Sequence, residues 1–339
     1  MRVVEIARPG GPEVLRIVER PSPVPGAGDV LIRVAAAAVN RPDVQQRRGL
    51  YPPPPGASDI PGLDVAGVVE ATDVAGLAVG DPVCALVNGG GYADYCTVPA
   101  VQCMPVPKGL NFVRAASLPE VFFTAWNTIV LLARLAEGET VLIHGGTSGV
   151  GMAAIQIARQ LFGATVFATA GSEAKRKVCT DIGATAAFDY RGAWDDAVRA
   201  ATGGEGVDVI LDAQAGPATQ RQLDLLMPDG RLAFMASHQG EMAEINIRQL
   251  VRRRLTVSGT TLRPRPASYK GRLARELVER VWPLLEDGRI VTRIHATLPL
   301  KDVRSAHAIL DANEQIGKVV LIVDPQLAAT DPASGSHRR

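Results

Sequence analysis

The sequence predicts an α/β protein of two domains: a doubly wound parallel sheet, and a mostly β domain formed from two separate stretches of chain. Three observations predict this class. The chain has 339 residues, which is long for one hydrophobic core. Short strand patterns lie between Pro- and Gly-rich turns over about the first 110 residues. After about residue 115, apolar strands alternate with helical patterns.

The first stretch, residues 1–120, contains candidate strands at 30–39, 64–72 and 81–87. Between them lie "ERPSPVPGAGD" and "YPPPPGASDIPG". These segments exclude regular structure, because proline lacks a backbone donor and fixes its own φ angle. A mostly β domain with long turns is therefore expected.

The middle of the chain, residues 121–261, carries the alternating pattern. Helical patterns over 151–162 and 173–182 separate some of its strands. Short apolar strands joined by helices are typical of a parallel, doubly wound sheet. The six candidate strands cover 140–144, 165–169, 186–188, 207–212, 231–236 and 255–259.

Residues 262–326 no longer follow this rhythm. They predict an amphipathic helix (about 269–287), a strand (293–298), a helix (301–312) and a last strand (318–323). We expect this segment to fold with residues 1–120, which makes that domain discontinuous. Residues 327–339 are small and polar, and a disordered tail is predicted there.

The composition excludes several classes of protein. Lys plus Arg (36) nearly balances Asp plus Glu (35), which gives no field to attract nucleic acid or an anionic membrane. The N-terminus becomes charged too soon for a signal peptide, and no apolar run is long enough to span a bilayer. Four cysteines without a CxxC pair predict reduced thiols and a cytoplasmic location.

The strongest chemical signal is "TVLIHGGTSGVG", residues 140–151, where a buried strand runs through glycines into an apolar helix. A backbone without Cβ can turn tightly and lie against a pyrophosphate, which the helix N-terminus then stabilises. The alternative is a simple strand–helix turn, but a second strand follows and ends at Thr169. We therefore predict a Rossmann domain that binds a dinucleotide at Gly146, Gly149, Val150 and Gly151.

The end of the second strand, "TAGSEAK" (residues 169–175), indicates which dinucleotide. NAD enzymes usually place an acid there to bind the ribose, and this strand end has none. Gly171, Ser172 and Lys175 could instead hold a 2′-phosphate, each charge-assisted bond contributing about 1.5–3 kcal/mol. Glu173 is expected to complement the helix dipole, and the alternative for Lys175 is a solvated helix lysine. The prediction is NADPH.

Several motifs spread over the chain carry a family resemblance. They are "GGPEVL" (10–15), "VNRPD" (39–43), "YPPPPGAS" (51–58), "GGGYADY" (89–95), "IHGGTSGVG" (143–151), "AGS" with Lys175, and "IGKVVL" (316–321). Together they resemble the zinc-independent quinone oxidoreductases among the medium-chain dehydrogenases/reductases. The resemblance implies that the discontinuous domain is GroES-like and catalytic. It also implies a homodimer, for which strand 255–259 is the candidate edge.

The resemblance also raises the question of a metal. In zinc-dependent relatives the turn before the strand at 64–72 contains Gly-His-Glu, and a cysteine some two dozen residues earlier supplies a second ligand. Here the turn is Gly62-Leu63-Asp64, and residues 35–50 contain no cysteine. Leu63 offers no lone pair, and a catalytic zinc needs about three protein ligands. We expect no metal.

Without a Lewis acid, ionising an alcohol at neutral pH is difficult, so alcohol oxidation is disfavoured. Hydride transfer from NADPH to an electrophilic acceptor remains, with positioning as the main source of catalysis. The acceptor is expected to be a quinone, with conjugated enones or enals as the alternative. A rival of another class, an NADPH-liganded RNA-binding or regulatory protein, is suggested only by Arg252-Arg253-Arg254, against near-zero net charge and few aromatics.

The resemblance implies further site residues. Asn40 is expected near the nicotinamide as a catalytic and cofactor-binding residue, with a helix N-cap as its alternative. Asp43 should support the same loop, and Tyr51 should border the acceptor, unless it is a surface tyrosine packed on proline. Some relatives carry a tyrosine where this chain has Gln45. The remaining cofactor contacts implied are Thr124, Asn127, Tyr190, Ser237, His238, Thr260, Thr261 and Leu262. His144 is expected only to pack.

Overall fold

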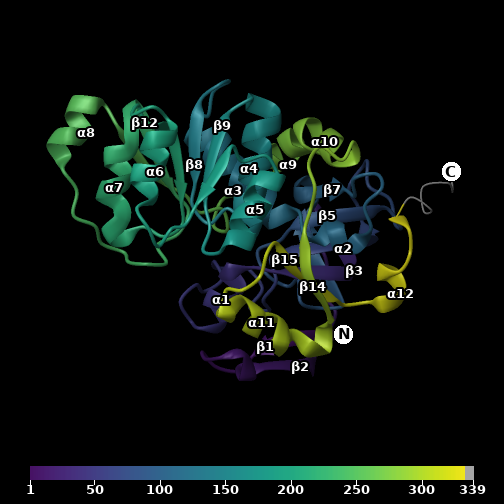
Figure 1. Cartoon of the computed structure of the whole chain (residues 1–339). Helices are drawn as coiled ribbons and strands as arrows, with labels where there is room; N and C mark the ends of the chain where they lie inside the picture. Colours follow the sequence, from purple (N-terminus) through teal and green to yellow (C-terminus); the bar gives the residue numbers. More distant parts are fainter. Residues whose placement is uncertain (333–339) are drawn as a thin grey trace. The chain divides into compact units, whose positions relative to one another are not determined.

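The computed structural model describes residues 1–332, and these divide into two compact units (Figure 1). The first unit holds Met1–Phe123 and the chain from Leu262 onward, and the second holds Thr124–Thr261. The second unit thus begins at Thr124 rather than at 121. Residues 327–328, expected in the tail, lie in a short helix, and residues 333–339 of that tail are outside the described residues.

The second unit contains a six-stranded sheet in which every neighbouring pair is parallel. Its strand order is β10-β9-β8-β11-β12-β13, which reverses direction between β8 and β11. In doubly wound sheets, ligands bind at the carboxyl ends of the strands at such a reversal. The strands are β8 (Thr140–Ile143), β9 (Thr165–Thr169), β10 (Ala186–Phe188), β11 (Val207–Asp212), β12 (Leu226–Phe234) and β13 (Thr256–Gly259).

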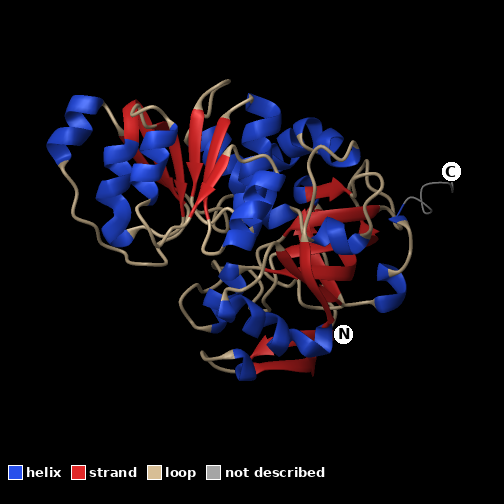
Figure 2. Cartoon of the chain, viewed as in Figure 1, coloured by secondary structure: helices blue, strands red, loops and turns tan. Residues whose placement is uncertain are grey.

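Helices flank this sheet, as Figure 2 shows. Buried side chains of the strands and helices, among them Leu142, Phe167, Val198 and Leu232, form its core. The predicted Rossmann class is confirmed. The helical segments are η3 (Trp126–Leu132), α4 (Gly149–Phe162), α5 (Glu173–Asp181), α6 (Trp194–Ala201), η4 (Gly216–Ala218), α7 (Thr219–Leu225) and α8 (Ile247–Arg253).

The first unit is built on a seven-stranded sheet of order β14-β15-β3-β4-β5-β7, with β6 also paired to β3. All its pairs are antiparallel except β14 with β15. Because β15 pairs with β3, the C-terminal segment completes the N-terminal sheet, as predicted. Strands β1 (Arg2–Ile6) and β2 (Leu15–Glu19) form a separate antiparallel pair. The seven strands of the sheet are β3 (Asp29–Val39), β4 (Asp64–Thr72), β5 (Pro82–Leu86), β6 (Tyr95–Pro99), β7 (Cys103–Pro105), β14 (Ile294–Pro299) and β15 (Lys318–Ile322).

The helices of the first unit are short, apart from α9 and α11. No helix within residues 1–332 has the length and apolar character needed to cross a membrane. The helical segments are η1 (Pro12–Val14), α1 (Arg41–Arg47), η2 (Ala100–Gln102), α2 (Phe112–Ala116), α3 (Pro119–Ala125, which crosses into the second unit), α9 (Ala267–Arg280), α10 (Trp282–Glu286), η5 (Leu300–Asp302), α11 (Val303–Ala312) and α12 (Pro325–Ala328).

Two predicted elements differ from the structure. The single helix over 269–287 is wrong: it divides into α9 and α10, because Pro283 has no N–H with which to continue the ladder. Strand β12 begins at Leu226 rather than at 231. Its register against β11 shifts between Leu226 and Arg231, so the turn-like Pro-Asp-Gly sequence lies in an irregularity inside the strand.

Candidate active site

The glycine-rich turn after β8 has no room for side chains. A Cβ on Gly146 would lie 2.7 Å from Cys179 Sγ and 2.9 Å from Ala168 Cβ. A Cβ on Gly151 would lie 2.3 Å from the carbonyl oxygen of Gly145, whose φ is +68°. The turn therefore holds strand and helix at close approach and leaves backbone as its surface, which fits a pyrophosphate.

Helix α4 starts directly from this turn, so that Gly149, Val150 and Gly151 form its first turn. Ser148 caps the helix, its Oγ accepting the N–H of Gly151 at 3.0 Å. The first amides of a helix lack intrahelical acceptors, and its N-terminus carries partial positive charge. This end of α4 lies where the strand order reverses, and it suits an anion.

The residues predicted for the adenosine end come together after β9. Ser172 caps α5, its Oγ accepting the N–H of Lys175 at 3.2 Å. Gly171 lies against the ring of Tyr190, since a Cβ there would be 2.7 Å from Tyr190 Cε1. The Tyr190 side chain is 47% exposed, which leaves ring surface open to a ligand.

Two arginines beside these residues were missed from the sequence. The Arg191 guanidinium lies 5.6 Å from the centroid of the Tyr190 ring. Both Arg191 and Arg176 pair with Asp189, at 3.0 and 3.2 Å, and the backbone N–H and guanidinium of Arg191 lower the pKa of that carboxyl. Each arginine directly follows a predicted residue, Lys175 or Tyr190, and that adjacency was the available signal.

The other predicted contacts of the second unit lie in three places. Asn127 is buried in the π-helical segment η3, and its Nδ2 donates to Thr260 Oγ1 at 2.6 Å. One turn earlier, the carbonyl of Thr124 accepts from Thr128 Oγ1. Such π segments are frequent at functional sites. Three other predicted contacts are exposed: Ser237 and His238, in the loop after β12, and Thr261. Leu262 is buried and belongs to the first unit.

His144 packs, as expected. Its ring meets Trp194 edge-on at 4.7 Å, and its Nδ1 lies 3.0 Å from Thr169 Oγ1. Burial lowers the pKa of His144. The basic run at 252–254 is partly engaged in the fold, because Arg253 donates to the carbonyl of Leu223 and Arg254 pairs with Asp229. Nothing in these contacts favours an RNA site.

In the first unit, Asn40 belongs to a buried polar cluster that the sequence did not predict. Its Nδ2 donates to Asp64 Oδ2 at 2.9 Å, and its Oδ1 accepts from Lys318 Nζ. Lys318 Nζ also donates to Asp64 Oδ2 at 2.9 Å, and Asp64 is fully buried. The remaining oxygen of Asp64 accepts the backbone N–H of Glu120. A lysine opening the apolar run "KVVLI" was the only sequence signal.

Asp43 supports the loop that carries Asn40. It is fully buried and accepts from the N–H of Asn40 at 2.8 Å, the N–H of Gly62 at 3.0 Å and the hydroxyl of Tyr92 at 3.0 Å. Burial raises the pKa of Asp43 to about 6. Asn40 stands at the N-cap of α1, and its amide is oriented by Asp64 and Lys318.

The turn Gly62-Leu63-Asp64, which in zinc-dependent relatives carries a metal ligand, is held here by the contacts of Asp64. Leu63 is buried, and the Asp64 carboxylate pairs with a lysine. Among residues 1–332, no group of three or more His, Cys, Asp or Glu side chains is placed to hold a metal ion. Freedom from metal remains a prediction about the reaction.

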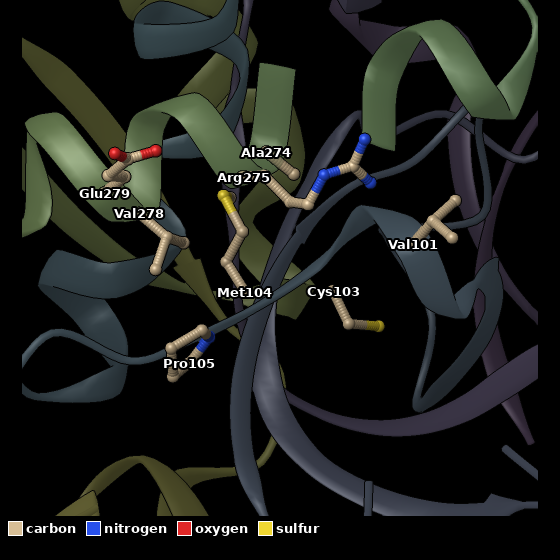
Figure 3. Close-up of a pocket in the computed structure, with 8 residues that line it drawn as sticks. All are labelled: Val101, Cys103, Met104, Pro105, Ala274, Arg275, Val278 and Glu279. Carbon is tan, nitrogen blue, oxygen red and sulfur yellow. The ribbon is translucent and has the colours of Figure 1, made fainter. Parts of the chain in front are cut away.

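A pocket of about 300 Å³ lies elsewhere in the first unit (Figure 3). Residues 101–105 and helix α9 line it, and its walls are mainly apolar. None of the predicted site residues is among them. The lining residues are Val101, Cys103, Met104, Pro105, Ala274, Arg275, Val278 and Glu279.

Comparison with known proteins agrees with this architecture. The family model described as "Zinc-binding dehydrogenase" matches residues 149–279, and "Alcohol dehydrogenase GroES-like domain" matches residues 26–108. Quinone oxidoreductase of Rattus norvegicus is 32% identical over 329 residues, covering 95% of this chain and 98% of the relative.

Two solved structures resemble the whole chain. A structure titled as an NAD-dependent alcohol dehydrogenase has a TM-score of 0.83 and 32% identity, covering 96% of this chain and 100% of that one. A mycobacterial protein complexed with NADPH has a TM-score of 0.85 and 30% identity, covering 95% and 100%. The chain belongs to the medium-chain dehydrogenase/reductase family and is an oxidoreductase of that type.

Proposed function

We propose that this protein is an NADPH-dependent quinone oxidoreductase that works without a metal. The observation that carries the proposal lies after β9, whose end lacks the acid of NAD enzymes: Ser172 caps the next helix, and Arg176 and Arg191 lie beside it. When bound, the nicotinamide supplies a hydride. The protein's contribution is to hold that cofactor, orient the acceptor and exclude competing reactions.

The cofactor preference follows from charge. A 2′-phosphate is a dianion, and Lys175, Arg176 and Arg191 are cations in the two segments that bring Gly171 against Tyr190. Guanidinium and ammonium bonds to phosphate contribute about 1.5–3 kcal/mol each. A relative solved with NADPH supports this choice, and one described as NAD-dependent marks the alternative.

The acceptor preference follows from the turn at Leu63-Asp64. The Asp64 carboxylate is already neutralised by Lys318, and Leu63 has no donor atom for a metal. An acceptor that needs no Lewis acid must be electrophilic before it binds, which favours a quinone. In this proposal Asn40, with its amide fixed, and Tyr51 belong to the acceptor's surroundings. Conjugated enones or enals are also electrophilic before they bind and would need the same residues, so they are the alternative acceptors.

We also propose a cytoplasmic homodimer. Strand β13 ends the sheet order, and Val257 on it is 40% exposed, which leaves an edge for a second copy. The four cysteines are free thiols. Light scattering of the purified protein tests the dimer: a monomer at micromolar concentration would contradict it.

The test of function is NADPH oxidation, followed by absorbance, with 1,2-quinones, 1,4-quinones, enones and enals. Turnover of quinones above enones supports the proposal, and the reverse order supports the alternative. Lys175→Ala should raise KM for NADPH about tenfold, with little change for NADH. Lys177→Ala, on the same helix and at the exposed pair with Asp181, is the matched control. Equal effects on both cofactors, or stoichiometric zinc whose removal stops turnover, would contradict the proposal.

A further inference from the structure

Arg263 is the second residue of the segment with which the chain re-enters the first unit at Leu262. Its guanidinium contacts three other segments of that unit. Its Nε and Nη2 donate to the carbonyl of Asn88, at 3.0 and 2.8 Å. Nη2 also donates to Gln46 Oε1 at 2.8 Å, and Nη1 lies 3.4 Å from the carbonyl oxygen of Tyr51. The guanidinium carbon stands 5.4 Å from the centroid of the Tyr51 ring. The Arg263 side chain is 5% exposed.

A second buried cation holds Arg263 in place. Lys270, on α9, is fully buried, and its Nζ donates to the carbonyl of Arg263 at 2.9 Å and to Asn88 Oδ1. Burial lowers the pKa of Lys270 to about 8. Burying two cations is costly unless their donors are matched, and the carbonyl of Arg263 and the side chain of Asn88 match those of Lys270 here.

The segment they hold is the loop 51–59, "YPPPPGASD". Its four consecutive prolines have no N–H, so this part of the loop can be anchored only through its carbonyls or side chains. At its start, the carbonyl of Tyr51 faces Arg263. At its end, the carbonyl of Asp59 accepts from Gln46 Nε2 at 2.8 Å, and Gln46 is itself bonded to Arg263. The Arg263 guanidinium therefore reaches both ends of the loop, directly at one and through Gln46 at the other, where the Arg20 guanidinium also pairs with the Asp59 carboxylate.

We infer that Arg263 is a positioning residue that clamps the loop 51–59 and sets the place of the Tyr51 ring toward the acceptor. Its planar fork serves the acceptors on Asn88, Gln46 and Tyr51 at once and stacks on the ring, which a single ammonium cannot do. The clamp itself is independent of the reaction. Its effect on acceptor binding rests on the proposed function.

Arg263→Lys tests the inference, because it keeps the charge and removes the fork. Hydrogen exchange at Ala57 and Ile60, whose N–H groups bond to the carbonyl of Pro54 and to Ser58 Oγ, should become about tenfold faster. KM for the quinone should rise about tenfold, with KM for NADPH and kcat within about twofold. The matched control is Arg265→Lys, two residues along, where the guanidinium is exposed and stacks only on Tyr269 in the contacts described. It should change neither quantity.

Two further variants separate the parts of the clamp. Gln46→Met should speed exchange at Ile60, the residue after the Asp59 carbonyl, and combining it with Arg263→Lys should add less than the sum of the two effects. Tyr51→Phe keeps both the carbonyl and the ring that Arg263 contacts, so the contacts of Arg263 with this residue should persist. If Arg263→Lys does not fold, Gln46→Met still tests the clamp.

The outcomes are distinct. Unchanged exchange at Ala57 and Ile60 in Arg263→Lys and in Gln46→Met overturns the clamp, and so does equal acceleration by Arg265→Lys. An acceptor KM that stays constant while exchange accelerates overturns the link to Tyr51. If the wild-type protein reduces no quinone or enone, the proposed function fails, and the exchange result still decides whether the clamp exists.

Discussion

The glycine turn of the second unit and the ion pair of the first unit solve the same problem, the placement of polar groups in a packed protein, by opposite means. The turn uses backbone from a short run of chain, and its requirement is the absence of Cβ atoms at Gly146 and Gly151. The pair joins Asp64 to Lys318, which are 254 residues apart, through side chains alone. The glycine turn is disrupted when a Cβ is added, and the ion pair is lost when a charged group is removed.

This difference has energetic consequences. Added bulk at the turn displaces backbone donors, whose main effect is on the ligand that they bind. A buried carboxylate deprived of its cation remains charged without its ion-pair partner, and the cost falls on folding. Variants at the two places should therefore lose different properties: ligand affinity at the glycine turn, and stability at the ion pair.

The largest effect is expected from Lys318→Met. The change leaves the buried Asp64 carboxylate facing only the neutral amide of Asn40 and the N–H of Glu120. Removing one partner of a buried ion pair typically costs about 3–5 kcal/mol. The free energy of unfolding, measured by urea denaturation, should fall by that amount.

Two variants control this prediction. Lys177→Met removes a lysine from the exposed pair with Asp181 in the second unit, and it should cost less than about 0.5 kcal/mol. Adding Asp64→Asn to Lys318→Met should recover part of the loss, because the uncompensated charge disappears. A Lys318→Met protein as stable as Lys177→Met would show that the pair does not govern stability.

The same contrast explains what the sequence could predict. The glycine turn was predictable because strand, turn and helix are consecutive, and strands β4, β9, β10 and β11 have the bounds expected from local pattern. The cluster at Asp64 was not. Its formation depends on β15 pairing with β3 in one register, which places Val319 opposite Val39. No local pattern near Lys318 specifies that partner.

The contacts of Arg263 and Arg176 could not be predicted from the sequence either. Each is an ordinary arginine in sequence, and its contacts with acceptors from other segments, such as Asn88 or Asp189, are visible only in the fold. The break between α9 and α10 was different, because Pro283 marks it locally and the helical pattern on either side concealed it.

The second prediction concerns the turn. Gly151→Ala places a Cβ 2.3 Å from the carbonyl oxygen of Gly145, so the start of α4 must move. Loss of two charge-assisted bonds to the pyrophosphate, at about 1.5 kcal/mol each, corresponds to about 150-fold weaker NADPH binding. Calorimetric titration measures this affinity.

Its control is Gly259→Ala in the same unit, where the nearest atom to the new Cβ is the carbonyl oxygen of Phe234 at 4.0 Å. That variant should bind NADPH as the wild-type protein does, within about twofold. If Gly151→Ala binds normally, the turn does not require a bare backbone, and the contrast with the ion pair is lost.

The smallest expected effect is a pH dependence of stability that arises in the first unit. His307 on α11 is fully buried beside Arg47 and Tyr92, and burial, with the nearby Arg47 charge, lowers its pKa to about 3. In the unfolded chain a histidine has a pKa of about 6.5. Between these values the unfolded state binds the extra proton, so stability is complete above about pH 6.5 and falls on acidification.

Between pH 7.5 and 5.5 the contribution of His307 amounts to about 1.4 kcal/mol lost from the free energy of unfolding. His307→Gln stays neutral across this range, so the variant should lose about that much less than the wild-type protein does. Carboxylates titrate alike in both proteins, and the difference between the two urea series isolates His307. Parallel losses in both would mean that His307 is protonated in the folded state, in conflict with its position against the Arg47 guanidinium.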